Sequence, residues 1–132
     1  MQNRIETIAA WSLAVLMIIF GLNKFLGFIP VDPPADATAQ SFMGAMFSTY
    51  LFVVVALAEI IGGIALLIPR FRFAGWLLLL PIIFNIVAFH VAHDFIGNGI
   101  WLLPTLIFGA LGYTLRHRIL SLLTSKNAPA PV

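Results

Sequence analysis

Six side chains that can exchange a proton or hold a ligand fall inside, or at the edge of, long apolar segments of this sequence. They are Lys24, Glu59, Asn85, His90, His93 and Asp94. Glu59 stands alone in an apolar run from Tyr50 to Ile68. A carboxylate among Val, Leu and Ile side chains is costly unless it is paired or neutral. We therefore expect Glu59 to hold helices together, to carry a proton or to bind a ligand.

Lys24 is the natural partner of Glu59, because it is the only basic residue expected within a membrane span. The expected depths of Lys24 and Glu59 in the membrane argue against an ion pair. At 1.5 Å per residue the two groups are expected to lie about 10 Å apart along the membrane normal. If the pair does not form, we expect Glu59 to be protonated, with Asn85 or a histidine as its hydrogen-bond partner. Both alternatives stay open at this point.

The stretch NIVAFHVAHDF carries a second group of polar side chains. His90 and Asp94 are four residues apart on one helical face, so Asp94 can orient or charge His90. One interpretation is a proton-handling or ligand-binding cluster at the outer mouth of a bundle. The other is that the histidines cap the helix and bond lipid headgroups. Two imidazoles and one carboxylate give too few ligands for a metal or haem site, so none is predicted.

Membrane-spanning helices must position these groups. The chain has 132 residues, of which 61% are hydrophobic and 9% charged, whereas soluble domains are about half apolar and a quarter charged. A span needs about 20 apolar residues. Four segments qualify, at about 5–28, 47–68, 73–95 and 100–115. The prolines of PVDPPADATAQ (30–40) predict a loop. The prediction is an all-α, single-domain four-transmembrane-helix bundle over residues 1–123, followed by a disordered cytoplasmic tail at 124–132.

The basic residues predict the orientation of the bundle. Six of the seven Lys and Arg residues fall on one side of a four-span chain: Arg4, Arg70, Arg72, Arg116, Arg118 and Lys126. This bias predicts that both termini face the cytoplasm. The polar side chains of the spans then lie toward the outer half, with no comparable group in the cytoplasmic half. The three tryptophans fall near span ends, which suits interfacial anchoring: Trp11, Trp76 and Trp101.

Small residues recur at helical spacing beside both charged groups. One face of the first span carries Ala10, Ala14, Met17, Gly21 and Lys24, and one face of the second carries Ala56, Glu59, Gly62, Gly63 and Leu66. Small residues let helices approach closely. Both charged side chains are therefore expected to point into the bundle, and Gly21, Gly62 and Gly63 to pack against other helices. The Gly62–Gly63 and Gly109–Gly112 seams also offer surfaces for a homo-oligomer.

The composition excludes several classes of function. Cysteine is absent, which excludes a disulfide framework, a thiol relay and cysteine-ligated zinc or iron–sulfur centres. The few basic residues flank membrane spans, so no nucleic-acid binding is predicted. Neither a nucleophile with an adjacent base nor a phosphate-binding loop is visible, and an autonomous enzyme is not expected.

The sequence resembles the DoxX-like family of small bacterial membrane proteins. The resemblance runs from about Arg4 to Leu123 and rests on GLNKF, which ends the first span, and on AEIIGGIALLIPR in the second. Its motifs are Gly21-x-x-Lys24-Phe25 and Glu59-x-x-Gly62-Gly63. The resemblance implies a four-helix bundle in the bacterial inner (plasma) membrane. It places Lys24 and Glu59 at recurring polar positions of the family. Some members are similar to subunits of thiosulfate:quinone oxidoreductase.

The expected function is therefore that of an accessory or membrane subunit of a quinone-linked redox system, with a partner subunit. In this hypothesis a quinone lies in the outer half of the bundle, where Glu59 and His90 bond its carbonyl oxygens and Lys24 biases their charge. Two alternatives remain open. One is a small proton-coupled carrier, and the other is a structural or assembly partner that binds no ligand.

Overall fold

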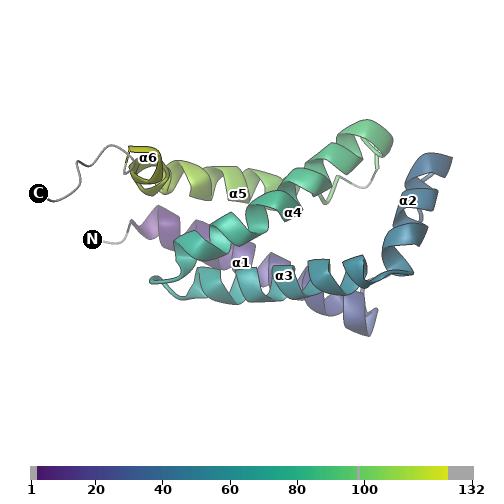
Figure 1. Cartoon of the computed structure of the whole chain (residues 1–132), viewed down its shortest axis with the longest axis horizontal. Helices are drawn as coiled ribbons and strands as arrows, with labels where there is room; N and C mark the ends of the chain where they lie inside the picture. Colours follow the sequence, from purple (N-terminus) through teal and green to yellow (C-terminus); the bar gives the residue numbers. More distant parts are fainter. Residues whose placement is uncertain (1–2, 98, 125–132) are drawn as a thin grey trace, which may run out of the picture.

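The computed structural model describes residues 3–97 and 99–124, which form six α-helices and no strand (Figure 1). The helices are α1 (Arg4–Leu26), α2 (Ala37–Phe47), α3 (Tyr50–Leu67), α4 (Arg72–His93), α5 (Leu102–Thr114) and α6 (Arg116–Thr124). The all-α prediction is confirmed for this part of the chain. Of the disordered tail predicted at 124–132, Thr124 is instead the last residue of α6, and residues 125–132 lie outside the described residues.

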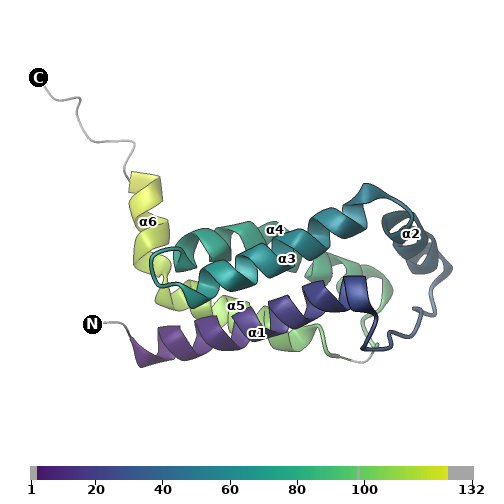
Figure 2. The same cartoon turned by 90° about the horizontal axis from the view of Figure 1, so that it is seen from below.

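Four of these helices form an antiparallel bundle. Successive helices α1, α3, α4 and α5 alternate in direction, so that α1 begins and α5 ends at the same end (Figure 2). The short helix α2 lies beside the opposite end, and α6 turns away from the bundle axis. Three of the described helices, α1, α3 and α4, are long and apolar enough to cross a membrane. Helix α5 is apolar but has 13 residues, a length of about 20 Å.

The core of the bundle follows the two small-residue faces predicted from the sequence. The buried residues of α1 include Ala10, Ala14, Met17 and Gly21, and those of α3 are Ala56, Glu59, Gly62, Gly63 and Leu66. A Cβ added to Gly63 would lie 2.7 Å from Ile18 Cγ1, a separation that real side chains do not tolerate. The predicted inward faces of α1 and α3 are therefore confirmed.

The glycine seams that we expected at an oligomer interface serve packing within the bundle instead. A Cβ on Gly62 would lie 2.7 Å from Leu79 Cγ, and one on Gly112 would lie 2.8 Å from Trp76 Cζ2. Gly75 of α4 lies against the Gly62 carbonyl in the same way. Gly109 has no heavy atom within 4 Å of its added Cβ. Gly62, Gly63 and Gly112 are therefore covered by neighbouring helices of the same chain, and of the four glycines expected at a partner interface only Gly109 is not.

Trp76 was predicted to anchor a span end at the membrane interface, but its side chain lies inside the bundle. Its indole is buried between α4 and α5, where Nε1 donates a hydrogen bond to the Phe108 carbonyl at 3.1 Å. The ring stacks on Phe108 with centroids 4.8 Å apart. The missing side chain of Gly112 leaves room for this ring. Trp76 therefore joins α4 to α5 inside the bundle.

The segment 30–40 is a loop only in its first part. Helix α2 begins at Ala37, because Asp36 caps it by accepting a hydrogen bond from the Ala39 N–H at 3.1 Å. The loop from α1 is closed by Asn23, whose side chain accepts from Ile29 N–H and donates to Ile29 O. The prolines precede the cap, so they restrict the loop and leave the helix intact. The prediction of a loop was wrong from Ala37 onward.

Candidate functional site

Lys24 and Glu59 form an ion pair between α1 and α3. Lys24 Nζ lies 2.6 Å from Glu59 Oε2. The Glu59 side chain is 2% exposed, whereas that of Lys24 is 20% exposed. A buried carboxylate is tolerated when a cation and a hydrogen bond compensate its lost hydration. The structure therefore joins the two groups that the depth argument had separated.

The packing of α1 on α3 explains why this pair can form. A Cβ added to Gly21 would lie 3.2 Å from Glu59 Cβ and 2.8 Å from the Ala56 carbonyl oxygen. Gly21 therefore lies directly against Glu59, and Lys24 is three residues further along α1. Three residues correspond to about 4.5 Å of helix rise, a distance that a lysine side chain spans. The depth estimate was wrong because it took no account of this register.

His90 lies at the end of α4 with both ring nitrogens near oxygen atoms. Its Nδ1 is 2.8 Å from the Ile86 carbonyl oxygen, and a carbonyl only accepts, so Nδ1 carries a proton. Its Nε2 lies 3.9 Å from Asp94 Oδ2, too far for a hydrogen bond. The ring stacks on Trp101 with centroids 5.3 Å apart. Nε2 is thus the ring nitrogen of His90 that faces the Asp94 carboxylate.

His93 makes a different contact from the one we expected. Its Nδ1 lies 2.9 Å from Oδ2 of Asp36, the residue that caps α2. The Ala39 N–H is the main cause that lowers the pKa of Asp36 from its ordinary value of 3.8, and the His93 side chain lowers it further. An ionised Asp36 accepts both hydrogen bonds. Asp36 was not among the predicted site residues, although an Asp before an Ala-rich helix start is a sequence signal for a cap.

Asn85 lies apart from the other predicted site residues. Its side chain is exposed on α4, and no hydrogen bond of its amide occurs among the described residues. The predicted cluster therefore divides into the Lys24–Glu59 pair, the neighbouring His90 and Asp94, and the His93–Asp36 contact, with Asn85 outside all three. Direct contact between Glu59 and His90, as expected around one ligand, is not among the interactions of the described residues.

A second ion pair lies at the opposite end of the bundle. Arg72 at the start of α4 is 1% exposed, and its Nη1 donates to Glu6 Oε1 of α1 at 2.9 Å. Its Nε donates to the Leu66 carbonyl at the end of α3 at 3.2 Å. Arg72 Nη2 is buried and has no hydrogen-bond partner among the described residues. The expectation that polar groups are confined to one half of the bundle was therefore wrong.

Few features of the sequence predict this second ion pair. Arg72 counted as one of the basic residues flanking the spans, and Glu6 precedes the apolar part of α1. The two residues are 66 positions apart, so no helical periodicity connects them. The signal available was that each charge adjoins a small-residue face that packs on a neighbouring helix.

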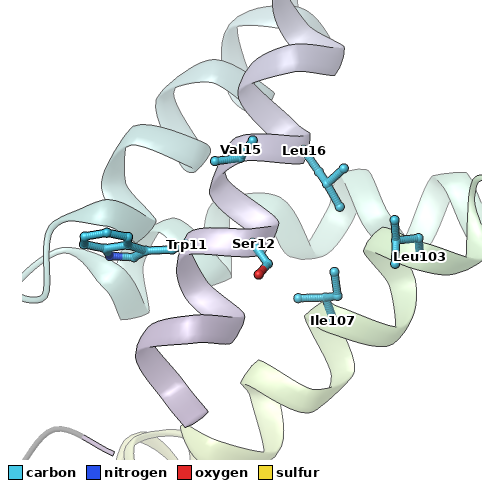
Figure 3. Close-up of a pocket in the computed structure, with 6 residues that line it drawn as sticks. All are labelled: Trp11, Ser12, Val15, Leu16, Leu103 and Ile107. Carbon is cyan, nitrogen blue, oxygen red and sulfur yellow. The ribbon is translucent and has the colours of Figure 1, made fainter. Parts of the chain in front are cut away.

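An open groove runs along the outside of the bundle between α1 and α5 (Figure 3). Its volume is about 480 Å³, and its lining residues are Trp11, Ser12, Val15, Leu16, Leu103 and Ile107. Apart from the Ser12 hydroxyl and the indole N–H, the lining is apolar. None of the six predicted site residues contributes to it. The groove therefore offers mainly apolar contact and lies away from the predicted polar groups.

Metal ligation finds no support among residues 3–97 and 99–124, where no three His, Asp or Glu side chains come together. Comparison with known proteins adds no relative, because no family model, curated protein or solved structure matches this chain significantly. The resemblance to the DoxX-like family therefore stays a prediction.

Proposed function

We propose that this chain is a multi-pass membrane protein that serves as an accessory subunit of a quinone-linked redox system. In this proposal α1, α3, α4 and α5 cross the bacterial inner membrane, with both termini in the cytoplasm. The distribution of side chains supports membrane insertion, because charges are paired inside the bundle while large apolar side chains cover its outside. The shorter α5 can be accommodated by local thinning of the bilayer.

The observation that carries the proposal is the exposure of Lys24 beside a buried Glu59. The ammonium group has three N–H donors, of which one bonds Glu59. Its 20% exposure leaves donors available to a carbonyl oxygen that arrives from the outer side. Lys24 is thus better placed than Glu59 to bond a quinone carbonyl. Glu59 holds the ammonium group in position.

The link to quinones comes from the family resemblance and needs a direct test. Protein purified in mild detergent should retain an extractable quinone and should bind decylubiquinone saturably. Replacing Lys24 by Met should weaken this binding at least tenfold, whereas Lys24→Arg should retain the fold and most of the affinity. Arg70→Met, which removes a cation at the other end, is the matched control. Protein that carries no quinone and shows no saturable binding would overturn the redox proposal.

The geometry argues against one of the two alternative functions and is compatible with the other. Along α1 the two ion pairs are about 27 Å apart at 1.5 Å per residue, and the buried side chains between them, such as Leu13 and Met17, are apolar. A proton-coupled carrier needs a continuous polar path, which these residues interrupt. A purely structural partner remains compatible with both ion pairs. It predicts that quinone is absent and that the charge-exchanged double variant Lys24→Glu/Glu59→Lys folds.

A further inference from the structure

Asn85 lies near the middle of the apolar helix α4, and its amide has no hydrogen-bond partner in the part of the chain that the structure describes. From the ends of α4 at Arg72 and His93 it is about 20 Å and 12 Å away, respectively, at 1.5 Å per residue. Its side chain is exposed on the outside of the bundle. In the membrane placement proposed above, on which this inference rests, the amide faces hydrocarbon. An amide in an apolar medium without a hydrogen bond is costly.

The other amide side chains of the described residues have partners. Asn3 accepts from Ile5 N–H, Asn23 is paired with both backbone groups of Ile29, and Gln40 donates to the Pro34 carbonyl. These residues cap helices or close loops, where the local backbone offers unpaired groups. Asn85 lies within α4, where the backbone groups pair with one another except at Pro81, which has no N–H and leaves the Leu77 carbonyl, eight residues before Asn85, without its usual donor. Because the described residues offer the Asn85 amide no partner, a group outside this chain is needed to satisfy it.

The residues around Asn85 form a regular seam on the exposed side of α4. The seam consists of Ala74, Leu78, Pro81, Asn85, Ala88 and Ala92, at spacings of 4, 3, 4, 3 and 4 residues, and all six are exposed. An alternating spacing of 3 and 4 keeps side chains on the contact line of two helices that coil around each other with a left-handed twist. Three alanines permit close approach of the backbones.

The rest of the exposed surface of α4 does not combine small residues with this regular spacing. Phe84 and Val91, which flank the seam on one side, are large side chains that are 73% and 56% exposed, as expected for contact with lipid. On the other flank, Phe89 and His93 contact Phe42 and Asp36 of the α2 segment. The seam is thus bounded by a lipid-facing flank and by α2.

We infer that the seam of α4 binds the same seam of a second copy of this chain. Two copies inserted in the same orientation have their α4 helices parallel, so a two-fold axis along the membrane normal brings the two Asn85 side chains to equal depth. A carboxamide is both donor and acceptor, so each Asn85 can donate to the other. A different membrane protein would have to supply a polar group at this depth by coincidence, whereas a second copy supplies it by symmetry.

Disulfide crosslinking tests the position of the seam. The chain has no cysteine, so a single introduced cysteine reports on its own position. With a copper–phenanthroline oxidant in membranes, Ala92→Cys should form a crosslinked dimer. Val91→Cys, the adjacent residue on the lipid-facing flank, is the matched control and should remain monomeric. Equal crosslinking at both positions, or none at Ala92, would overturn the inference.

The strength of association tests the role of the amide. In liposomes, the dimer fraction measured by energy transfer against the protein-to-lipid ratio should show that Asn85→Leu weakens association about tenfold, about 1.4 kcal/mol. Asn85→Gln keeps the amide and should retain most of the association, and Phe84→Leu should leave it unchanged. An Asn85→Leu variant that dimerises like the wild type contradicts the proposed contact, as does wild-type protein that pairs only with another membrane protein.

The failure of this inference can be told apart from failure of the proposed function. Resistance of the chain to extraction by alkaline carbonate reports membrane integration independently of dimerisation. A chain released by carbonate overturns the membrane placement and the seam together. A chain that resists extraction, binds decylubiquinone and stays monomeric at every lipid ratio overturns the seam alone.

Discussion

At the start of α1, Glu6 meets Arg72 of α4, whereas near its end Lys24 meets Glu59 of α3. Helix α1 supplies the anion at its N-terminal end and the cation at its C-terminal end, the arrangement that its macrodipole favours. The buried member of each pair comes from the neighbouring helix: a guanidinium at one end and a carboxylate at the other.

The two pairs differ in how many helices they connect. Arg72 bonds Glu6 of α1 and the Leu66 carbonyl of α3, so one side chain of α4 joins three helices. Among the described residues Glu59 bonds only Lys24, so this pair joins two helices. Arg72 is also sealed from solvent, whereas Lys24 is partly exposed. The Arg72 side chain is thus enclosed by the helices that it joins, whereas the Lys24 ammonium stays partly accessible.

The largest effect is expected from Arg72→Met. Removal of one partner of a buried ion pair leaves Glu6 without compensation, so the free energy of unfolding should fall by about 3–5 kcal/mol. Reversible unfolding in mixed detergent–SDS micelles measures this. Arg70→Met removes an equal charge from an exposed position two residues away and should have little effect. If the two variants were equally stable, Arg72 would owe its position to membrane orientation alone.

Lys24→Met should lower the free energy of unfolding by about 2–3 kcal/mol, less than Arg72→Met because Lys24 makes one hydrogen bond to another helix, whereas Arg72 makes two. The same unfolding assay, applied to Lys24→Met, Glu59→Gln and the double variant, gives the interaction energy of the pair. We expect at least about 1 kcal/mol. Additive effects of the two substitutions would show that the ion pair contributes nothing to stability.

Gly21→Ala tests whether close packing of α1 on α3 is what allows the Lys24 pair to form. The added methyl group would lie 2.7 Å from Ile60 Cγ1 and 2.8 Å from the Ala56 carbonyl, and stability should fall by about 1–3 kcal/mol. Gly109→Ala, where nothing lies within 4 Å, should be neutral or stabilising by up to about 1 kcal/mol. Equal losses at both sites would contradict the packing explanation.

The smallest effect concerns the contact between α2 and α4. Because the pKa of Asp36 is lowered in the folded protein, its carboxylate stabilises the docked α2 above about pH 3.8, and this stabilisation is lost as the pH falls through the folded pKa. As the pH falls below about 3.8, a cysteine introduced at Phe42 should therefore become more accessible and react faster with 4,4′-dithiodipyridine, a thiol reagent that stays reactive in acid. Asp36→Asn should remove this pH dependence. A rate that rises equally in both proteins would assign the change to another group.

The parts of the fold that depend on helical periodicity were predictable from the sequence. The faces that carry Gly21 and Glu59 follow from small residues repeating every three or four positions, and both faces are buried. The same reasoning placed Lys24 toward the bundle. Periodicity did not predict how far α1 is shifted along α3, because this shift depends on which side chains interlock. The close approach of Gly21 to Glu59, which sets the shift, is known only from the three-dimensional structure.

Contacts between distant segments were not predictable in the same way. In the sequence, Arg72 and Glu6 are charges that flank the predicted spans. They form a pair only because the ends of α1, α3 and α4 meet at one place. Helix α2 was missed because its preceding prolines dominated the segment, although Asp36 carried the cap signal. The contact between Asp36 and His93 spans 57 positions, and no local pattern indicates it.

The placement of α2 has a consequence for biogenesis. Helix α2 is made before α3 and α4, yet Phe42 and Asp36 find their contacts on Phe89 and His93 at the far end of α4. A nascent chain that ends before His93 therefore holds an α2 segment without these contacts. All of the contacts that dock α2 are therefore available only after the whole of α4 has been synthesised.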